Sequence, residues 1–369
     1  MNYHMFASES VCAGHPDKIC DQVSDAVVDA AITADKKSRV AIETLVTENY
    51  LTMAGEVTCP TKLDYADIAR GVIKDLGYTK EEYKFSNKSK IEVFVHQQSP
   101  DIAVGVNGGG AGDQGMMFGY AVNETEELMP LPISMAHALA KKMDELKVGK
   151  LSYLRPDGKS EVAVVYEKGK PVGVETVVLA CPHDPSIDKK QVHEDMYTYA
   201  VLPVFEQYKL KPVAQDKLIL NGTGRWEIGG PSSDTGVTGR KIIVDTYGGM
   251  GRVGGGCFSG KDVTKVDRAA AYGTRYIAKN IVAAGLADRC EVQVAYVIGY
   301  RDPIAKTIET FGTEKKSMKV IEDFAWKLLD MTVSGIIEGL DLRRPIYRQT
   351  ARYGHFGNPT YPWEKIANK

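Results

Sequence analysis

The sequence lacks several features that would mark a specialised class of protein. Its charges nearly cancel, with 46 Lys and Arg against 48 Asp and Glu and a formal net charge of −2. A chain-wide basic field that would hold nucleic acid or anionic lipid is therefore excluded, although a local basic patch is not. Apolar runs such as residues 281–284 fall far short of the roughly 18–20 residues that span a bilayer.

Paired cysteines and targeting segments are missing as well. The six cysteines form no CxxC pair and no regular spacing, which in a chain of 369 residues indicates reduced thiols rather than a disulfide framework or a zinc site. Residues 1–10 have neither the basic nor the apolar stretch of a signal peptide. We therefore expect a cytoplasmic protein with no membrane and no nucleic-acid partner.

The length predicts two or three domains, and the hydrophobic spacing predicts a mixture of helices and strands. Strand pairs followed by helices recur in each third of the chain, which favours an α+β fold over a parallel doubly wound sheet. Helices are expected at 17–34, 64–76, 131–146, 186–208, 262–285 and 317–330. Strands are expected at 40–47, 51–58, 91–95 and 241–247, with a hairpin across 162–181 that turns at Lys168-Gly169.

Glycine is present in excess, with 36 residues, about one in ten, where about 7% is usual. Two Gly-rich stretches, 105–115 and 221–239, could mark linkers. For the first, a linker or mobile loop and a binding role both remain open. The second carries charged and aromatic residues that a passive linker does not need: Arg225, Trp226 and Asp234, with Arg240 just after it.

The strongest local signal is the segment 248–260, in which seven of thirteen residues are glycine. A β-rich run before it and a helical pattern after it predict exposed backbone N–H groups and a helix N-terminus, which together bind phosphate. Residues 255–261 satisfy GxxxxGK, but Asp262 stands where a P-loop needs Ser or Thr to hold Mg²⁺. Lys261, Lys265 and Arg268 fall on one helical face, either as part of this site or as a solvated face.

A second signal is the turn Gly14-His15-Pro16-Asp17-Lys18, which enters the first predicted helix. Pro16 suits the first helical turn, and Asp17 could cap the helix or bind a metal. Asp17 begins a row of aspartates that repeats every four residues through 21, 25 and 29. Like charges at this spacing destabilise a helix slightly, so the row is either a solvated face or the start of a Mg²⁺ site.

Together these motifs resemble the S-adenosylmethionine synthetase (methionine adenosyltransferase) family. The resemblance rests on GHPDK at 14–18, GAGDQG at 110–115, RPDGKS at 155–160, TGRKIIVDTYGG at 238–249, GGGCFSGKD at 254–262, GHFG at 354–357 and PWEK at 362–365. It runs from about Phe6 to Lys365. It implies three α+β domains related by approximate three-fold symmetry, each a mixed sheet packed with helices, which we place at 2–100, 108–228 and 229–367.

The resemblance also implies a reaction. Members join L-methionine to ATP by attack of the sulfur on the ribose C5′, which displaces tripolyphosphate that is then hydrolysed to pyrophosphate and phosphate. A thioether has no proton to lose, so the first step needs alignment and charge stabilisation rather than a base. Members use Mg²⁺, two ions per site, and K⁺, and they form homodimers with shared active sites, often as dimers of dimers.

Site residues carry over at the matching positions. The family pattern implies catalytic roles for His15, Lys159, Arg240, Lys241, Lys261 and Lys265. It implies ATP binding by His15, Asp157, Lys159, Arg225, Trp226, Asp234, Arg240, Lys241, Cys257 (through its backbone) and Lys261, with Arg268 beside them. It implies methionine binding by Glu56, Gln98, Asp234 and Lys265, Mg²⁺ binding by Asp17 and Asp267, and an association of Glu43 with K⁺.

Two departures and two rival hypotheses accompany this interpretation. The segment between Pro100 and Asp113 is several residues shorter than in common bacterial members, and Trp226 replaces a phenylalanine frequent in them. A different ATP-using enzyme, such as a kinase, would require a hydroxyl residue at position 262. A non-enzymatic descendant of the family would have lost a catalytic residue, and none of those named is missing.

Overall fold

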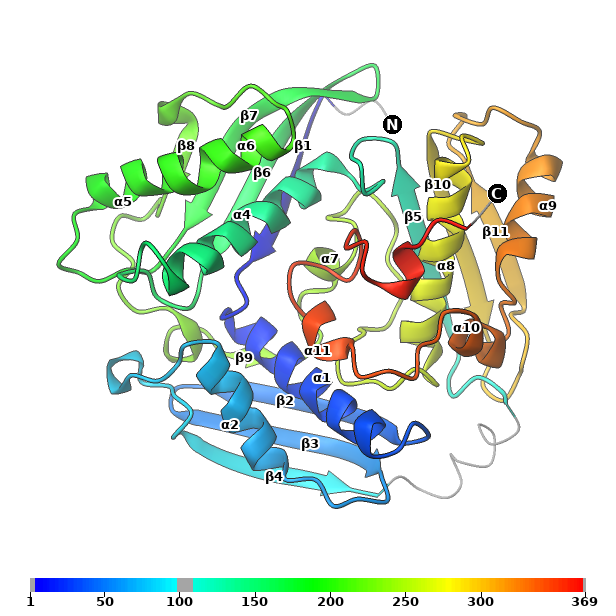
Figure 1. The fold of residues 1–369 in the computed structure, drawn as a ribbon, viewed down its shortest axis with the longest axis horizontal. Coiled ribbons are helices and arrows are strands. Elements are labelled where there is room, and N and C mark those ends of the chain that lie inside the picture. Colours follow the sequence, from blue (N-terminus) through cyan, green and yellow to red (C-terminus); the bar gives the residue numbers. More distant parts are fainter. Residues whose placement is uncertain (1–3, 98–108, 368–369) are drawn as a thin grey trace.

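A computed structural model describes residues 4–97 and 109–367. It consists of three sheets, each covered on one face by helices and set around a common centre (Figure 1). The predicted three-domain α+β fold is confirmed. Among the helices of the described residues, none has both the length and the apolar character needed to cross a membrane.

The first sheet has the order β4-β3-β2-β9. Its strands are β2 (Arg39–Thr47), β3 (Tyr50–Thr58), β4 (Lys90–His96) and β9 (Gly236–Val237). Helices α1 (Pro16–Ala34) and α2 (Tyr65–Asp75) cover one face (Figure 1). Along β2 the residues facing these helices are buried and alternate with more accessible ones on the opposite face, as a sheet with one covered face requires.

The second sheet has the order β1-β6-β7-β8. Its strands are β1 (Met5–Val11), β6 (Lys159–Glu167), β7 (Lys170–Ala180) and β8 (Leu218–Leu220). The predicted hairpin is β6–β7, and Lys168 and Gly169 both have the positive φ that its turn requires. The covering helices are α4 (Leu131–Val148), α5 (Lys189–Met196), a π-helical turn at Tyr197–Val201 and α6 (Leu202–Gln207).

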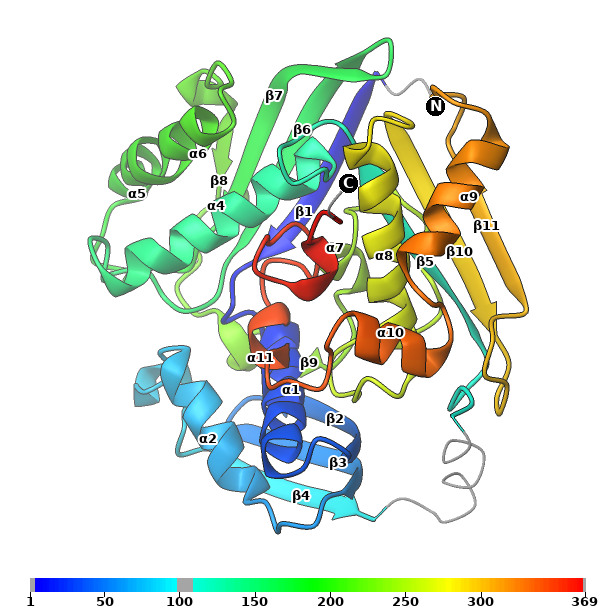
Figure 2. The ribbon, with the colours of Figure 1, turned by 45° about the vertical axis from the view of Figure 1, so that its right-hand side comes forward.

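The third sheet has the order β11-β10-β5. Its strands are β5 (Gly115–Val122), β10 (Arg289–Tyr296) and β11 (Ala305–Glu309). Its helices are α8 (Val266–Ala283), α9 (Met318–Leu328) and α10 (Val333–Gly339). Figure 2 shows α8 and α9 side by side over this sheet. Two short helices, α7 (Ile242–Asp245) and α11 (Tyr347–Thr350), lie in the centre between the three layers (Figure 1).

The three layers exchange chain segments. The most N-terminal strand, β1, pairs with β6 in the second sheet, and β5 pairs with β10 in the third. The short strand β9, far along the chain, adds to the free edge of β2. Residues 260–262 join the same edge further along, since Ile42 N donates to the Gly260 carbonyl and Asp262 N to the Val40 carbonyl. Two Gly-rich loops are thereby fixed to one strand.

Two local predictions are wrong. Residues 241–247 contain the one-turn helix α7 instead of a strand, because Asp245 N bonds back to the Lys241 carbonyl at 2.8 Å and the buried Asp245 side chain pairs with Lys18 on α1. Tertiary contacts thus override the β-branched composition of the segment. The other error concerns α8, which begins only at Val266, so that Lys261 and Lys265 precede it and the three cations share no helical face.

Candidate active site

The aspartate row of helix α1 is buried and holds loops. Asp17, Asp21 and Asp25 are 2%, 0% and 0% exposed, so the solvated-face interpretation is wrong. Each carboxylate accepts a backbone N–H from a segment far along the chain. The donors are Val237 for Asp17 (2.9 Å), Gly239 for Asp21 (2.8 Å), Gly260 for Asp25 (2.9 Å), and Tyr347 and Arg348 for Asp29 (2.8 and 2.9 Å).

His15 caps the N-terminus of α1, a role that the sequence suggested for Asp17. Its Nδ1 accepts the backbone N–H of Asp17 at 3.2 Å, which leaves the ring proton on Nε2. That Nε2 is buried and has no hydrogen-bond partner among the described residues. Burial, followed by the charges of Lys241 and Lys159, lowers the pKa of His15 to about 3. The ring is therefore a neutral donor at physiological pH.

Asp17 lies next to this ring and forms an ion pair with Lys241. Burial works against its charge, but the hydrogen bonds from Lys241 and from Val237 N prevail and lower the pKa of Asp17 below its usual value. His15, Asp17, Lys159 and Lys241 thus form one cluster, which we call the histidine cluster. It combines a carboxylate, a neutral donor and two cations.

Asp157 lies on a tight turn before β6 and is 3% exposed. Its two carboxylate oxygens accept the N–H groups of Gly230 at 2.8 Å and Gly158 at 2.7 Å. Gly229 packs against it so closely that an added Cβ would lie 2.9 Å from the Asp157 Cβ. The predicted nucleotide-binding turn is therefore joined to the Gly-rich loop 221–239.

A second cluster, the lysine cluster, consists of Glu43, Cys257, Lys261 and Asp267. The Lys261 ammonium lies 2.6 Å from Asp267 Oδ2. Burial opposes its charge, but Cys257 and Asp267 raise the pKa of Lys261 overall. The Asp267 carboxylate lies against the Gly256 backbone, where a Cβ would come within 2.0 Å of its Cγ. Burial raises the pKa of Cys257 to about 11, so its thiol is protonated and is no nucleophile.

The backbone that carries Lys261 is clamped by a fully buried ion pair. Arg268 binds both oxygens of Asp25, at 2.6 and 2.8 Å. Asp25 accepts the Gly260 N–H, and Arg268 donates to the Lys261 carbonyl at 3.0 Å. Arg268, which the family pattern places beside the cationic residues, is thus buried, paired with Asp25 and in contact with the Lys261 backbone. Lys265 likewise pairs with the buried Asp262, 2.5 Å away.

Asp262 explains the near-match to a P-loop. Its carboxylate accepts from Val40 N at 2.8 Å and from Thr264 N at 2.9 Å as well as from Lys265. It is therefore used in joining the loop to β2. Because α8 starts five positions after Lys261, no helix N-terminus follows the GK pair directly, as a P-loop needs.

Two predicted residues lie on the face of the first sheet that α1 and α2 do not cover. The strand registers place Glu43 opposite Ala54, Glu56 opposite His96 and Ala54 opposite Phe94. Glu56 and His96 approach to 3.2 Å, and Phe94 is 61% exposed. Ala54 and the exposed Phe94 thus lie beside Glu43 and Glu56 on this face of the sheet.

The remaining predicted residues belong to neither cluster or fall outside the described residues. Asp234 and Arg240 are exposed, and neither forms an ion pair within residues 4–97 and 109–367. Arg225 is exposed with Glu227 at 3.8 Å, and the Trp226 indole N–H donates to the Ile228 carbonyl at 3.0 Å. Gln98 falls in 98–108, outside the described part of the chain, as does most of the stretch 105–115.

Comparison with known proteins decides the family. Residues 3–100, 108–226 and 228–365 match the N-terminal, central and C-terminal domain models of S-adenosylmethionine synthetase. The chain belongs to the S-adenosylmethionine synthetase family. It is 48% identical to the S-adenosylmethionine synthase of Desulforudis audaxviator (strain MP104C), over 99% of this chain and 97% of the relative. The predicted family, and with it the activity of S-adenosylmethionine synthesis from the substrates ATP and methionine, is confirmed.

Sequence reasoning missed the supporting residues of the site. Asp21, Asp25 and Asp262 each bind the backbone of a segment that carries a predicted site residue. Lys18 on α1 pairs with Asp21 on the same helix and with Asp245 on α7. The regular spacing of the aspartates was the available signal. A row of like charges that costs helix stability requires partners, and here the partners are loop N–H groups and buried cations.

Proposed function

We propose that the histidine cluster and the lysine cluster together bind the triphosphate of ATP and drive transfer of its adenosyl group to the methionine sulfur. The observation that carries this assignment is the buried Nε2–H of His15, which has no partner among the described residues and stands beside Lys159, Lys241 and Asp17. A buried donor without an acceptor requires one, and a departing triphosphate oxygen is such an acceptor.

In the chemical step the sulfur lone pair forms a bond to C5′ while the C5′–O bond breaks and its electrons leave on the triphosphate. His15 donates a hydrogen bond to that oxygen without first losing or gaining a proton, because its pKa of about 3 keeps the ring neutral. Lys241, Lys261 and the exposed Lys159 and Arg240 stabilise the polyanion by charge. The sulfur needs no base, in keeping with the protonated Cys257.

Asp17 and Asp267 fit the Mg²⁺ role. Both are carboxylates, the donor type that Mg²⁺ prefers. The Lys241 ammonium pairs with Asp17 and the Lys261 ammonium with Asp267, so each carboxylate already has a positive charge beside it. No group of three or more His, Cys, Asp or Glu suited to a metal occurs among the described residues. This agrees with Mg²⁺, which typically takes one or two carboxylates and completes its shell with water and substrate phosphates. When bound, two Mg²⁺ ions would neutralise the triphosphate.

The remaining assignments extend the site to its other substrates. Trp226 and Arg225 offer a flat surface for adenine, with Asp157 in the turn behind them. Glu56, Asp234, Lys265 and Gln98 are proposed for methionine, and the Cys257 backbone for the nucleotide. Glu43 offers a single carboxylate beside Lys261 for K⁺.

We further propose a cytoplasmic homodimer with shared active sites, assembling as a dimer of dimers, with domains at 2–100, 108–228 and 229–367. Two features support the shared site. No hydrogen bond or ion pair within the described residues joins a member of the histidine cluster to one of the lysine cluster. Glu43 and Glu56 also lie on an exposed sheet face with Phe94, which a second copy would cover.

The activity is tested by incubating the protein with ATP, L-methionine, Mg²⁺ and K⁺ and measuring the sulfonium product by mass spectrometry. We expect the product and methionine-dependent phosphate release. His15→Ala should depress sulfonium formation more than hydrolysis of added tripolyphosphate. Equal loss of both activities would contradict a role for His15 at the leaving oxygen.

The shared site is tested with hybrid dimers of Asp17→Asn and Lys261→Ala chains, each inactive alone. If Asp17 and Lys261 act from different chains, one of the two sites in each hybrid contains both native residues, and up to half of the native activity returns. A hybrid that stays inactive would mean that both residues act from the same chain.

A further inference from the structure

Two turns that carry proposed site residues lie side by side at one end of the second sheet. Residues 12–15 follow β1 and carry His15, and residues 156–158 precede β6 and carry Asp157. We call them the histidine turn and the aspartate turn. The paired register of β1 and β6 ends where these turns begin. Contacts beyond the sheet must therefore fix one turn against the other.

Both turns are bound by one ion pair on α4. Asp144 and Lys147 approach to 2.8 Å, and their side chains are 19% and 9% exposed. Asp144 Oδ2 accepts the N–H of Ala13 at 2.8 Å, in the histidine turn. Lys147 Nζ donates to the carbonyl oxygens of Pro156 and Asp157, each at 3.0 Å, in the aspartate turn. The ion pair thus connects the two turns through α4.

The hydrogen-bonding capacity of the pair is committed to this connection. The three oxygen acceptors of Lys147 match the three N–H donors of an ammonium group. Burial disfavours its charge, but Asp144 prevails and raises the pKa of Lys147 above its ordinary value. Asp144 Oδ2 also accepts the Tyr353 hydroxyl at 2.7 Å. Removing the ammonium would take this donor from two turn carbonyls and the balancing charge from Asp144.

The two turns also touch each other closely. Cys12 N donates to the Gly158 carbonyl at 2.9 Å. A Cβ on Gly14 would lie 2.4 Å from the Pro156 carbonyl oxygen, and one on Gly158 would lie 2.7 Å from Cys12 Sγ. A displacement of the aspartate turn would therefore be passed on to the histidine turn and to His15.

We propose that Asp144 and Lys147 are positioning residues for adenosyl transfer. They hold the histidine turn against the aspartate turn, so that the His15 Nε2–H stays directed at the departing triphosphate oxygen. They act through His15 and not on the substrate, and the inference rests on the role proposed above for His15. Such alignment is sensitive, since a misplacement of about 1 Å can cost ~100-fold in rate.

Lys147→Met tests the pair, because methionine is similar in length but lacks the charge and the donors. It should lower kcat for sulfonium formation at least ~10-fold per folded molecule and lower hydrolysis of added tripolyphosphate less than ~3-fold, the pattern expected of His15→Ala. Lys147→Arg keeps a charge and donors and should return kcat to within about threefold of native. The adjoining hollow of about 700 Å³, which Lys147 lines, has room for the guanidinium. A lower melting temperature with unchanged kcat would overturn the proposal.

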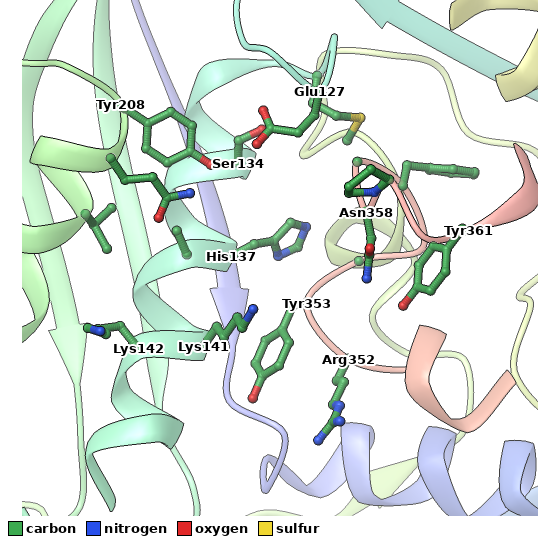
Figure 3. Close-up of a pocket in the computed structure, with 18 of the residues that line it drawn as sticks. Glu127, Ser134, His137, Lys141, Lys142, Tyr208, Arg352, Tyr353, Asn358 and Tyr361 are labelled. Atoms are coloured by element: carbon green, nitrogen blue, oxygen red, sulfur yellow. The ribbon is translucent and has the colours of Figure 1, made fainter. Parts of the chain in front are cut away.

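The matched control is Lys142→Met on the same helix. Lys142 and Glu145 form another i,i+3 pair, at 3.1 Å. Figure 3 shows Lys142 and Tyr353 on opposite sides of α4, and the hydrogen bond from Tyr353 to Asp144 marks the side on which the positioning pair lies. The control should keep the native kcat. Equal kcat in Lys142→Met and Lys147→Met would refute the role of the pair.

A double variant tests whether Lys147 acts through His15. In His15→Ala the donor that the pair positions is absent, so adding Lys147→Met should lower sulfonium formation by at most about threefold more. Losses that multiply would mean that Lys147 acts independently of His15, contrary to the proposal.

The His15 ring is followed directly by ¹⁵N NMR of histidine-labelled protein, in which its signal is assigned by its loss in His15→Ala. The signal should move in Lys147→Met, return in Lys147→Arg and stay in place in Lys142→Met. An unmoved signal in Lys147→Met would overturn the positioning role, whatever the activity. A signal that moves, in a protein whose native form makes no sulfonium product, would support the positioning and contradict the proposed function alone.

Discussion

Replacing Asp25 with Asn removes the charge from one member of a fully buried ion pair. Asp25 and Arg268 are both 0% exposed, and Arg268 would keep its positive charge with no carboxylate to balance it. Breaking a buried pair from one side costs about 3–5 kcal/mol. The unfolding entropy is about 2.1 cal/mol/K per residue. For a chain of 369 residues that unfolds as one unit, dividing the lost stability of about 3–5 kcal/mol by this entropy gives a melting temperature lower by ~4–6 °C.

The assay is differential scanning calorimetry at fixed protein concentration, with sulfonium formation measured alongside. The activity should fall too, because Asp25 and Arg268 hold the Gly260–Lys261 backbone from both sides. The matched control is Asp323→Asn on α9, which removes an exposed i,i+4 pair with Lys319 at 3.4 Å. A surface pair is worth about 0–1 kcal/mol, so the control should melt within ~1 °C of the native protein.

A double-mutant cycle separates the ion pair from other effects of the substitution. Asp25→Asn combined with Arg268→Met removes both charges, and its loss should be smaller than the sum of the two single losses. A melting temperature of Asp25→Asn within ~1 °C of native, together with unchanged activity, would refute the reasoning. Additive losses would show that the two side chains do not act as a pair.

Three further predictions concern the clusters. Gly256→Ala would place a Cβ 2.0 Å from the Asp267 Cγ and should reduce activity at least ~100-fold by moving that carboxylate. The control Gly255→Ala, whose Cβ would meet nothing within 4 Å, should be nearly as active as the native protein. Equal activities of the two variants would contradict the role given to the Gly256 contact. In ¹⁵N NMR, His15 should show no titration between pH 5 and pH 8, because its pKa is about 3; a midpoint near 6.5 would mean that the ring is not buried as described. The Cys257 thiol should react slowly with iodoacetamide at pH 8 and faster only as the pH approaches its pKa of about 11, a rise that mass spectrometry of the modified peptide would follow; rapid modification at pH 8 would contradict the burial.

Much of the local structure could be predicted from the sequence because it depends on short-range patterns. Apolar spacing located α1, α2, α4 and α9, and the alternation across 162–181 located the hairpin. The pattern failed at 241–247, where Ile242, Ile243 and Val244 favour a strand but the buried contact between Asp245 and Lys18 fixes a helical turn. It also misplaced the start of α8, because nothing in the local composition separates Lys265 from the helix that follows it.

The candidate site followed the same division. His15, Asp17, Lys241 and Lys261 could be proposed from the sequence, because the motifs that contain them resemble those of the family. Asp25, Asp262 and Arg268 could not be assigned their roles, because those roles depend on which distant backbone groups each side chain meets. A neutral His15 likewise depends on burial, which a single motif does not encode.

The sequence by itself determined the family, the helices α1, α2, α4 and α9, the β6–β7 hairpin and the glycine-rich loops, because each depends on local spacing or on motifs. Only the tertiary structure decided that the aspartate row of α1 is buried and holds the loops, that β1, β5 and β9 pair with sheets distant in sequence, and that Lys261 is clamped by Asp25 and Arg268. The physical reason is burial: an aspartate at a helix surface is solvated unless another segment covers it, and only long-range pairing of strands and loops brings that segment there.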